Sequence, residues 1–288
     1  MRALAVLVLV TAVWGVTFVQ VKDAVALYPL LAFFAVRFAL GGAALAPFGL
    51  PRVAGLGREG IAAACLAGVI LGAAYALQTA GLQRTTVSAT GFITGMQTVL
   101  TPVVGLVLFR TRVAPASWIG VGLATVGLAL LAGVHRGSPA GDLLVLAGAA
   151  GFAVQITLMG RFAPRYDALA FTFVELVAVC LGFVVLALAR GELTVPHGPT
   201  VWGALIVTGL FATAFAFLAQ TWAQKRTTAT RTALAFALEP VWAAFFGVTL
   251  KGDSLGTAGW IGCAVIMAGI VVAELGATGF AGRPDPAR

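Results

Sequence analysis

The sequence has few charged residues and few groups suited to acid–base or metal chemistry. Only 10% of its 288 residues are charged, whereas an ordinary soluble domain has about 25%. By contrast, 60% are hydrophobic and the mean hydropathy is +1.03. A soluble fold could not bury so large an apolar fraction, so the composition predicts an integral membrane protein.

The scarce reactive residues argue against several classes of function. His135 and His197 fall in loops, and neither HExxH nor the nucleotide-binding GxxxxGK[ST] occurs, so an embedded enzyme or an ATPase is disfavoured. Cys65, Cys180 and Cys263 lie in apolar stretches without CxxC or His-flanked spacing, so neither a disulfide framework nor a metal site is predicted. The basic residues are scattered instead of forming one stripe, which disfavours nucleic acid as a partner. We expect no cofactor.

The apolar residues form stretches close to the ~20 residues that an α-helix needs to cross ~30 Å of hydrocarbon. Short segments with Arg, Lys, Gly and Pro separate them. The pattern predicts ten transmembrane helices near 3–21, 29–48, 60–82, 88–109, 115–134, 142–160, 168–189, 200–222, 231–250 and 255–275. The first stretch lacks a persuasive cleavage site, so we expect it to remain as a helix.

The basic residues predict the orientation in the membrane. A cytoplasmic N-terminus places twelve of the eighteen on the cytoplasmic side. These are Arg2, Arg52, Arg58, Arg110, Arg112, Arg161, Arg165, Lys225, Arg226, Arg231, Arg283 and Arg288. Five face the other side, and Arg37 lies within a span. The positive-inside rule therefore predicts that both termini are cytoplasmic.

The two halves of the chain resemble each other. LAFFAVR at 31–37 matches LAFTFVE at 169–175, QTAGLQRTT at 78–86 matches QTWAQKRTT at 220–228, LTPV at 100–103 matches LEPV at 238–241, and WIG recurs at 118–120 and 260–262. Each repeat has five spans, an odd number, so the second copy must cross the membrane in the direction opposite to the first. We predict an all-α membrane protein of two inverted five-helix repeats, 1–137 and 138–288, around a central cavity, an organisation suited to alternating access.

These motifs resemble the EamA-type transporters of the drug/metabolite transporter superfamily. The resemblance rests on WGVTF at 14–18, Arg37-Phe38, the two RTT segments, and LEPV followed by WIG, and it covers about residues 3–276. It implies ten helices in two inverted halves, a central substrate cavity, and export of small metabolites across the bacterial inner membrane. Within the family, the sequence is most similar to exporters of aromatic and other neutral amino acids.

Polar residues at helical spacing mark the expected cavity. In the fourth span, Thr90, Thr94, Gln97 and Thr101 fall on one helix face. Further cavity candidates are Trp14, Thr17, Phe18, Tyr75, Gln78, Thr79, Phe152, Gln155, Phe217, Gln220 and Glu239. Alternatively, such Gln and Thr side chains only hydrogen-bond neighbouring helices. For the stripe in the fourth span we favour the cavity.

Three charged residues, Arg37, Glu175 and Glu239, lie within spans and away from their ends, where charge is costly. Glu175 or Glu239 would bind a proton in a coupled cycle or the amino group of a substrate, and Arg37 would receive a carboxylate. The alternative is structural: Arg37 would bond helix-end carbonyls, and each glutamate would be protonated or bonded to a neighbouring helix. We favour the structural role for Arg37 and leave both open for the glutamates.

Pro102 and Pro240 occupy equivalent positions in the two halves, and each removes a helix hydrogen bond. We predict that they are hinges. The expected function is secondary transport with a small-molecule substrate in the bilayer, by a monomer or a homodimer. A drug, sugar or other metabolite is the alternative substrate, and a channel or an embedded enzyme is the alternative class.

Overall fold

The computed structural model describes residues 2–85, 87–111, 113–132, 138–242, 245–246 and 256–278. Nearly all of these residues are helical, and no strand occurs among them. The first half contains α1 (Arg2–Leu27), α2 (Leu30–Gly49), η1 (Leu50–Leu56), α3 (Gly57–Leu82), α4 (Val87–Gly95), α5 (Gln97–Phe109) and α6 (Pro115–Ala132). The second half contains α7 (Pro139–Phe162), η2 (Ala163–Arg165), α8 (Ala168–Arg190), α9 (Pro199–Gly209), η3 (Leu210–Phe215), α10 (Ala216–Gln224), α11 (Ala229–Phe236) and α13 (Thr257–Thr278). Residues 239–242 and 245–246 are also helical.

Local signals set several helix ends. The Asp167 side chain accepts a hydrogen bond from the Ala170 amide at 3.0 Å and caps the start of α8. At the other end of α8, Gly191 has φ +64°, a backbone conformation that glycine adopts without strain. The Thr228 side chain caps α11 in the same way as Asp167 caps α8.

The described residues of each predicted span are largely helical, and residues 133–134, 243–244, 247–250 and 255 of these spans lie outside the described residues. The number of membrane crossings stays a prediction. Four described helical stretches are long and apolar enough to cross a bilayer: Leu30–Leu82, Pro139–Arg165, Ala168–Arg190 and Pro199–Gln224. Arg2–Leu27 is a fifth if its two parts, which are bent by 41°, count as one span. Shorter apolar helices are Ile93–Phe109, Pro115–Leu130 and Thr257–Ala273.

Three of the predicted spans are less regular than continuous α-helices. The fourth breaks at Met96, which forms a turn between α4 and α5, next to Gly95, a residue of low helix propensity. The ninth breaks after Phe236, just before Pro240. The eighth is α-helical in α9 and α10 but π-helical in η3 between them, and π-helical turns are frequent at functional sites.

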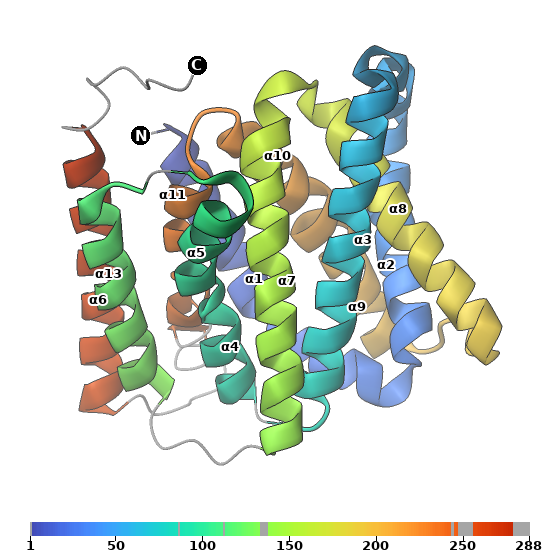
Figure 1. Ribbon diagram of the computed structural model, residues 1–288. Coiled ribbons are helices and arrows are strands. Elements are labelled where there is room, and N and C mark those ends of the chain that lie inside the picture. The colour runs from blue at the N-terminus through green and yellow to red at the C-terminus, as the bar shows by residue number, and fades with distance from the viewer. Residues whose placement is uncertain are drawn as a thin grey trace.

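Each main contact between two helices has a counterpart between the equivalent helices of the other half. α6 packs on α13 and α2 on α8, so each lies against its own repeat equivalent (Figure 1). α3 packs on α7, and the equivalent helices of the other half, α9 with α10 and α1, also pack together. In the same way, the contact of α3 with α8 corresponds to that of α9 with α2. The two halves are therefore interleaved around a shared centre, and the fold is that of an inverted repeat.

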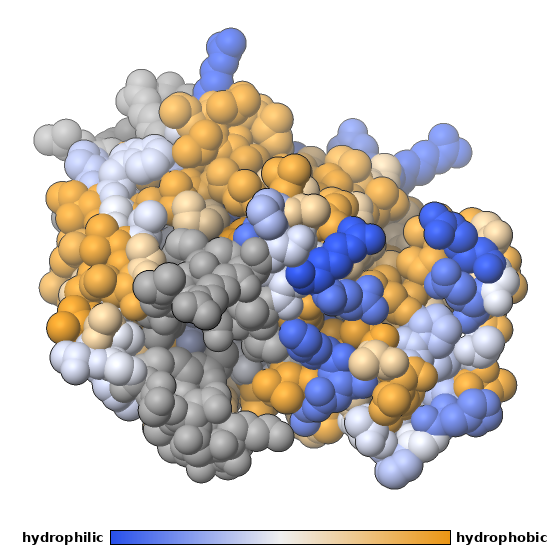
Figure 2. Space-filling view, turned by 90° about the horizontal axis from the view of Figure 1, so that it is seen from below, coloured by the Kyte–Doolittle hydropathy of each residue, from blue (hydrophilic) through white to orange (hydrophobic). Residues whose placement is uncertain are grey.

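The start of α1 and the end of α13 lie at the same end of the bundle, which is the upper end in Figure 1. Large apolar side chains on several helices are exposed, among them Val69, Val107, Leu143 and Val185. Figure 2 shows the lower end, where hydrophilic residues gather among hydrophobic ones. An apolar flank between polar ends fits a bundle surrounded by lipid.

Candidate functional site

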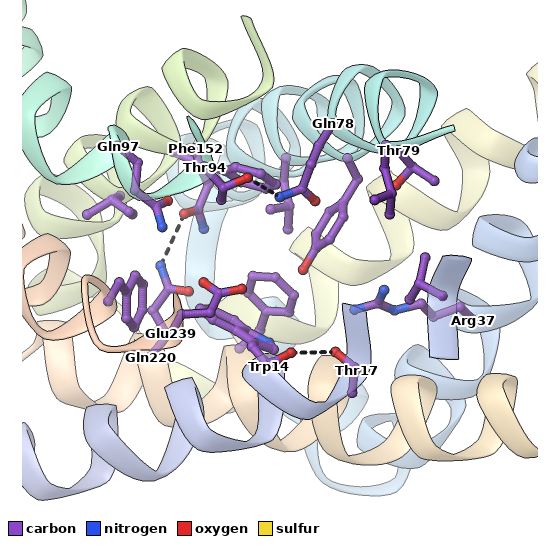
Figure 3. A pocket seen from close by; sticks show the side chains of 18 residues that line it. Trp14, Thr17, Arg37, Gln78, Thr79, Thr94, Gln97, Phe152, Gln220 and Glu239 are labelled. Atoms are coloured by element: carbon purple, nitrogen blue, oxygen red, sulfur yellow. Dashed lines mark hydrogen bonds between the residues drawn. The ribbon is translucent and has the colours of Figure 1, made fainter. Parts of the chain in front are cut away.

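A cavity lies at the centre of the bundle, where the two halves meet (Figure 3). The space not filled by atoms in the cavity and at its opening is about 640 Å³. The part of it that the centre of a water molecule can occupy is about 50 Å³. This space holds a few water molecules. The lining residues are Trp14, Thr17, Val21, Arg37, Leu71, Tyr75, Gln78, Thr79, Leu82, Thr94, Gln97, Phe152, Gln155, Ile156, Phe217, Gln220, Phe236 and Glu239.

Most residues predicted for the site are in this lining. From the first half, the structure brings together Trp14, Thr17, Tyr75, Gln78, Thr79, Thr94 and Gln97. From the second half come Phe152, Gln155, Phe217, Gln220 and Glu239. Helices α1, α3, α4 and α5 thus meet α7, α10, α11 and the helical residues 239–242 around one space. The Phe18 side chain lies outside the described residues.

Other predicted residues lie behind the cavity wall. Thr101 is buried and bonds back to the Gln97 carbonyl at 2.7 Å, without reaching the cavity. Thr90 is also buried and is absent from the lining. The polar stripe of the fourth span is therefore split: its central members, Thr94 and Gln97, face the cavity, and its ends pack against protein.

Amide and hydroxyl groups form two hydrogen-bonded sets in the wall. In the first half, Gln78 Nε2 donates to Thr94 Oγ1 at 2.8 Å. In the second half, Gln220 Nε2 donates to Gln155 Oε1 at 3.1 Å. Gln78 and Gln220 are repeat equivalents, so the two halves place the same amide on the same cavity. Hydrogen bonds of this kind keep polar groups satisfied in an apolar surrounding.

Aromatic rings form the apolar part of the wall. The ring centroid of Trp14 is 5.7 Å from that of Phe217 and 4.9 Å from that of Phe236. Tyr75 packs edge-on against Phe152 at 5.1 Å and against Phe217 at 6.3 Å. Such tilted and edge-on contacts are the favoured geometry for aromatic pairs. The rings therefore hold one another in place around the cavity.

The π-helical turn η3 anchors two residues of the lining. Trp14 Nε1 donates to the Ala212 carbonyl at 2.9 Å. Arg37 Nε donates to Thr213 Oγ1 at 2.8 Å, and its Nη2 lies 3.5 Å from the same Ala212 carbonyl. A π-helical turn leaves carbonyls without their usual α-helical partners. η3 thus binds residues of α1 and α2 from the other half.

Arg37 is placed both for the structural role that the sequence favoured and for contact with the cavity. It bonds a backbone carbonyl of a neighbouring helix, and it also lines the cavity. Its guanidinium carbon lies 4.9 Å from the centroid of the Tyr75 ring and 5.7 Å from those of Phe34 and Phe38. At these distances the π faces of the rings attract the cation.

Two residues of opposite formal charge face the cavity without balancing each other. Among the described residues, neither Arg37 nor Glu239 forms an ion pair, and no hydrogen bond joins Glu239 to a neighbour. Figure 3 shows Arg37 and Glu239 reaching the cavity from different sides. Each is nearly buried, so each has a large desolvation cost that a ligand of the opposite charge would reduce.

Glu175 does not line the cavity. It is fully buried in α8, and its Oε1 accepts a hydrogen bond from Gln155 Nε2 at 2.7 Å. Gln155 thus separates the Glu175 carboxyl from the cavity. The two repeat-equivalent charges, Arg37 and Glu175, therefore occupy different environments: one faces the cavity and the other lies behind a glutamine.

The cavity is not equally deep toward both ends of the bundle. Its lining reaches Leu82, the last residue of α3, at the lower end in Figure 1. Toward the upper end, an apolar cluster from α1, α7, α10 and α11 packs across it, including Leu7, Val10, Ala223 and Phe236. The described packing therefore closes the cavity on the side of the chain termini.

The sequence did not identify the apolar members of the wall. Val21, Leu71, Leu82, Ile156 and Phe236 line the cavity, but in so hydrophobic a chain they carry no mark that separates them from lipid-facing residues. Phe236 was the most accessible to inference, since it lies three residues before Glu239 and so within one helical turn of it.

Pro102 and Pro240 both follow a helix break in the chain and lie outside the cavity lining. Pro102 is inside α5, six residues beyond the turn at Met96. Pro240 follows the turn that ends α11 by two residues. In both halves the break adjoins a cavity residue, Gln97 or Glu239.

Comparisons with known proteins agree with this architecture. The model of the EamA-like transporter family matches residues 1–133 and again 139–275. An uncharacterized transporter of Archaeoglobus fulgidus is 30% identical over 274 residues, which cover 93% of this chain and 84% of the relative. A solved crystal structure aligns with a TM-score of 0.79 over 97% of this chain and 98% of its own, at 21% identity. This last likeness concerns the fold alone.

Proposed function

The chain belongs to the EamA-like transporter family, which makes it a membrane transporter and not an enzyme, and we propose that it exports small zwitterionic metabolites by alternating access. Aromatic and other neutral amino acids are the proposed substrates. The proposed binding residues are those of the central cavity.

The observation that carries this proposal is that two ionisable side chains of opposite type, Arg37 and Glu239, line one cavity without pairing with each other. A zwitterion brings an ammonium group for Glu239 and a carboxylate for Arg37, and charge-assisted hydrogen bonds to both would offset the cost of burying them. The remaining wall is aromatic and amide-rich, which suits an uncharged side chain. A solute of amino-acid size exceeds the space for a few waters, so its entry requires wall side chains to move apart.

The two inverted halves support alternating access. Because the halves are interleaved and related by exchange, a packing that closes one end has a counterpart that closes the other. The structure has its apolar closure at the end of the chain termini. The basic residues favour cytoplasmic termini, and the family resemblance implies a bacterial inner membrane. With this orientation, the conformation is closed toward the cytoplasm. The repeats proposed are 1–137 and 138–288.

A second candidate substrate class is favoured by the amide groups. Gln78, Gln97 and Gln220 offer donors and acceptors but no charge, and such groups also suit sugars. A sugar would not use Arg37 or Glu239 as ionic partners. The two candidates therefore differ in whether the charged residues matter for binding.

Counterflow in proteoliposomes tests the proposal. Purified protein would be assayed with labelled alanine, phenylalanine, a sugar and a cationic drug. We expect saturable counterflow of the amino acids, and a sharp loss of affinity in Glu239→Gln. Glu59→Gln, an exposed carboxylate at the start of α3, is the matched control and should behave as the native protein. Movement of the sugar or drug but of no amino acid would overturn the proposed substrate, and fast unsaturable flux would indicate a channel.

A further inference from the structure

The Glu175 carboxyl is buried, and one of its two oxygens has no hydrogen-bond partner. Oε1 accepts one hydrogen bond, from Gln155, and Oε2 has no partner. Buried carboxylate oxygens are normally hydrogen-bonded, and a buried charge without a counter-ion is costly. The neutral acid therefore suits this environment better than the carboxylate does.

The elements around α8 bring no charge to balance Glu175. α8 packs against α2, α3, η1 and α10. The charged residue of α2 is Arg37, whose Nε is engaged by Thr213. In α3 the titratable group on this side is Tyr75, while Arg58 and Glu59 lie in its first turn, at the upper end of the bundle. η1 contributes Arg52, which bonds the Phe48 carbonyl, and α10 has no ionisable side chain. In α7, which supplies Gln155, Asp142 and Arg161 lie near opposite ends.

A chain of glutamines connects this carboxyl to the closed end of the cavity. Gln155 donates to Glu175 and accepts from Gln220 Nε2. Gln220 Nε2 also lies 3.0 Å from Gln224 Oε1, and Gln224 Nε2 donates to the Ile156 carbonyl at 2.8 Å. These bonds join α8, α7 and α10 beside the apolar cluster that closes the cavity. Separation of α10 from α7 must break the bonds between these two helices and expose the Gln155 side chain.

The two buried glutamates thus occupy different positions. Glu239 lines the cavity, where a solute reaches it directly. Glu175 is separated from the cavity by Gln155, which is hydrogen-bonded both to Glu175 and to Gln220, an amide of the cavity wall. A group that senses the conformation without touching the solute is suited to coupling rather than to binding.

We propose that Glu175 is the proton-coupling residue of the transport cycle, distinct from the substrate carboxylate Glu239. This inference rests on the proposed export function. In the conformation seen here, Glu175 holds a proton, with an O–H bond at one carboxyl oxygen. When the end nearer the termini opens, water reaches the carboxyl, the O–H bond breaks and the proton passes to water. The structure then closes at this end with Glu175 as a carboxylate, which takes up a proton from water that enters from the opposite, outer side, so one proton moves inward as one solute moves outward.

Separate measurements of coupling and exchange test this role. Proteoliposomes would be assayed for accumulation of external labelled substrate driven by a pH gradient and, without a gradient, for counterflow into liposomes preloaded with unlabelled substrate. Glu175→Gln keeps the shape and the Gln155 contact but cannot release a proton. We expect it to lose gradient-driven accumulation and to retain counterflow, whereas Glu239→Gln should lose both. The matched control Glu59→Gln should retain both.

Proton release gives a second readout that does not depend on the variant's transport rate. Adding substrate to the detergent-solubilised native protein in weak buffer should release protons, detected with a pH dye, and Glu175→Gln should release none. Native counterflow without any effect of the pH gradient would overturn the coupling role and leave the transport proposal intact. Equal gradient-driven accumulation by the native protein and Glu175→Gln would also overturn it. Absence of native counterflow with every solute would instead defeat the proposed function.

Discussion

Gly120 in α6 and Gly269 in α13 approach so closely that a Cβ on either would lie 2.6–2.7 Å from the carbonyl oxygen of the other. The repeat equivalents of these residues, Gly262 and Gly127, form the corresponding contact: a Cβ on Gly127 would lie 2.6 Å from the Gly262 oxygen. The same backbone contact thus occurs twice, related by exchange of the halves. Small residues that let helices approach are a main source of association in membranes.

We therefore expect Gly120→Ala to destabilise the α6–α13 pair. The new methyl group meets backbone, which cannot swing away, and overpacking of this kind costs about 1–3 kcal/mol. The midpoint of thermal unfolding in detergent, followed by size-exclusion chromatography after heating, should fall. Gly122→Ala is the matched control, because nothing lies within 4 Å of a Cβ at that position in the same helix. Equal midpoints for the two variants would show that the close contact is not limiting.

Trp14→Phe tests the link between α1 and η3. The substitution keeps an aromatic ring beside Phe217 and Phe236 but removes the donor to the Ala212 carbonyl. Loss of one such bond costs about 1 kcal/mol, and because this bond holds a wall of the cavity in place we expect the KM of transport to rise, by at most about fivefold. Trp202→Phe is the control, because Trp202 Nε1 also donates to a carbonyl, that of Pro196, away from the cavity. An unchanged KM in Trp14→Phe would mean that the ring alone positions this wall.

Arg37→Lys tests whether the fork of the guanidinium matters beyond its charge. Lysine keeps the charge but loses the hydrogen-bond geometry that Thr213 and the Ala212 carbonyl impose. Hydrogen bonds to charged groups contribute about 1.5–3 kcal/mol, so the KM of a carboxylate-bearing solute should rise roughly tenfold or more. A solute that carries an amine but no carboxylate should be moved with an unchanged KM.

Thr213→Val separates positioning from binding. It removes the Nε partner of Arg37 while leaving the guanidinium in the cavity, so the KM should rise less than in Arg37→Lys. The double variant should be close to Arg37→Lys alone, because both changes act on one interaction. Strictly additive effects would show that Thr213 does not act through Arg37.

The polar part of the cavity was predictable because lipid forces polar side chains inward. Gln78 and Gln220 were found from their repeat positions and helical spacing, and both face the cavity. Leu71 and Phe236 were not identified from the sequence, because an apolar side chain is equally compatible with lipid and with the protein interior. The residue types of Leu210–Phe215 do not predict a π-helical turn, because this turn depends on how α1 and α2 pack against the segment. The position of Glu175 behind Gln155 likewise follows from packing between helices.

Pro102→Ala and Pro240→Ala test the hinge prediction. Each restores a backbone donor next to a helix break and should stiffen the segment that must bend. We expect a lower maximal rate of counterflow with little change in KM, since binding residues stay in place. Pro47→Ala is the control, because Pro47 also lies inside a helix, α2, but away from these breaks. Native rates in both hinge variants at native expression would contradict the prediction.

The orientation in the membrane can be measured across a single helix. Arg165 and Arg190 are both exposed and flank α8 at its two ends, and the basic residues predict that Arg165 is cytoplasmic and Arg190 is not. In a chain whose Cys65, Cys180 and Cys263 are replaced, we expect Arg190→Cys to react with a membrane-impermeant maleimide added outside intact spheroplasts. Arg165→Cys should react only after the membrane is opened. The reverse pattern would invert the proposed topology, and the closed end of the cavity would then face outward.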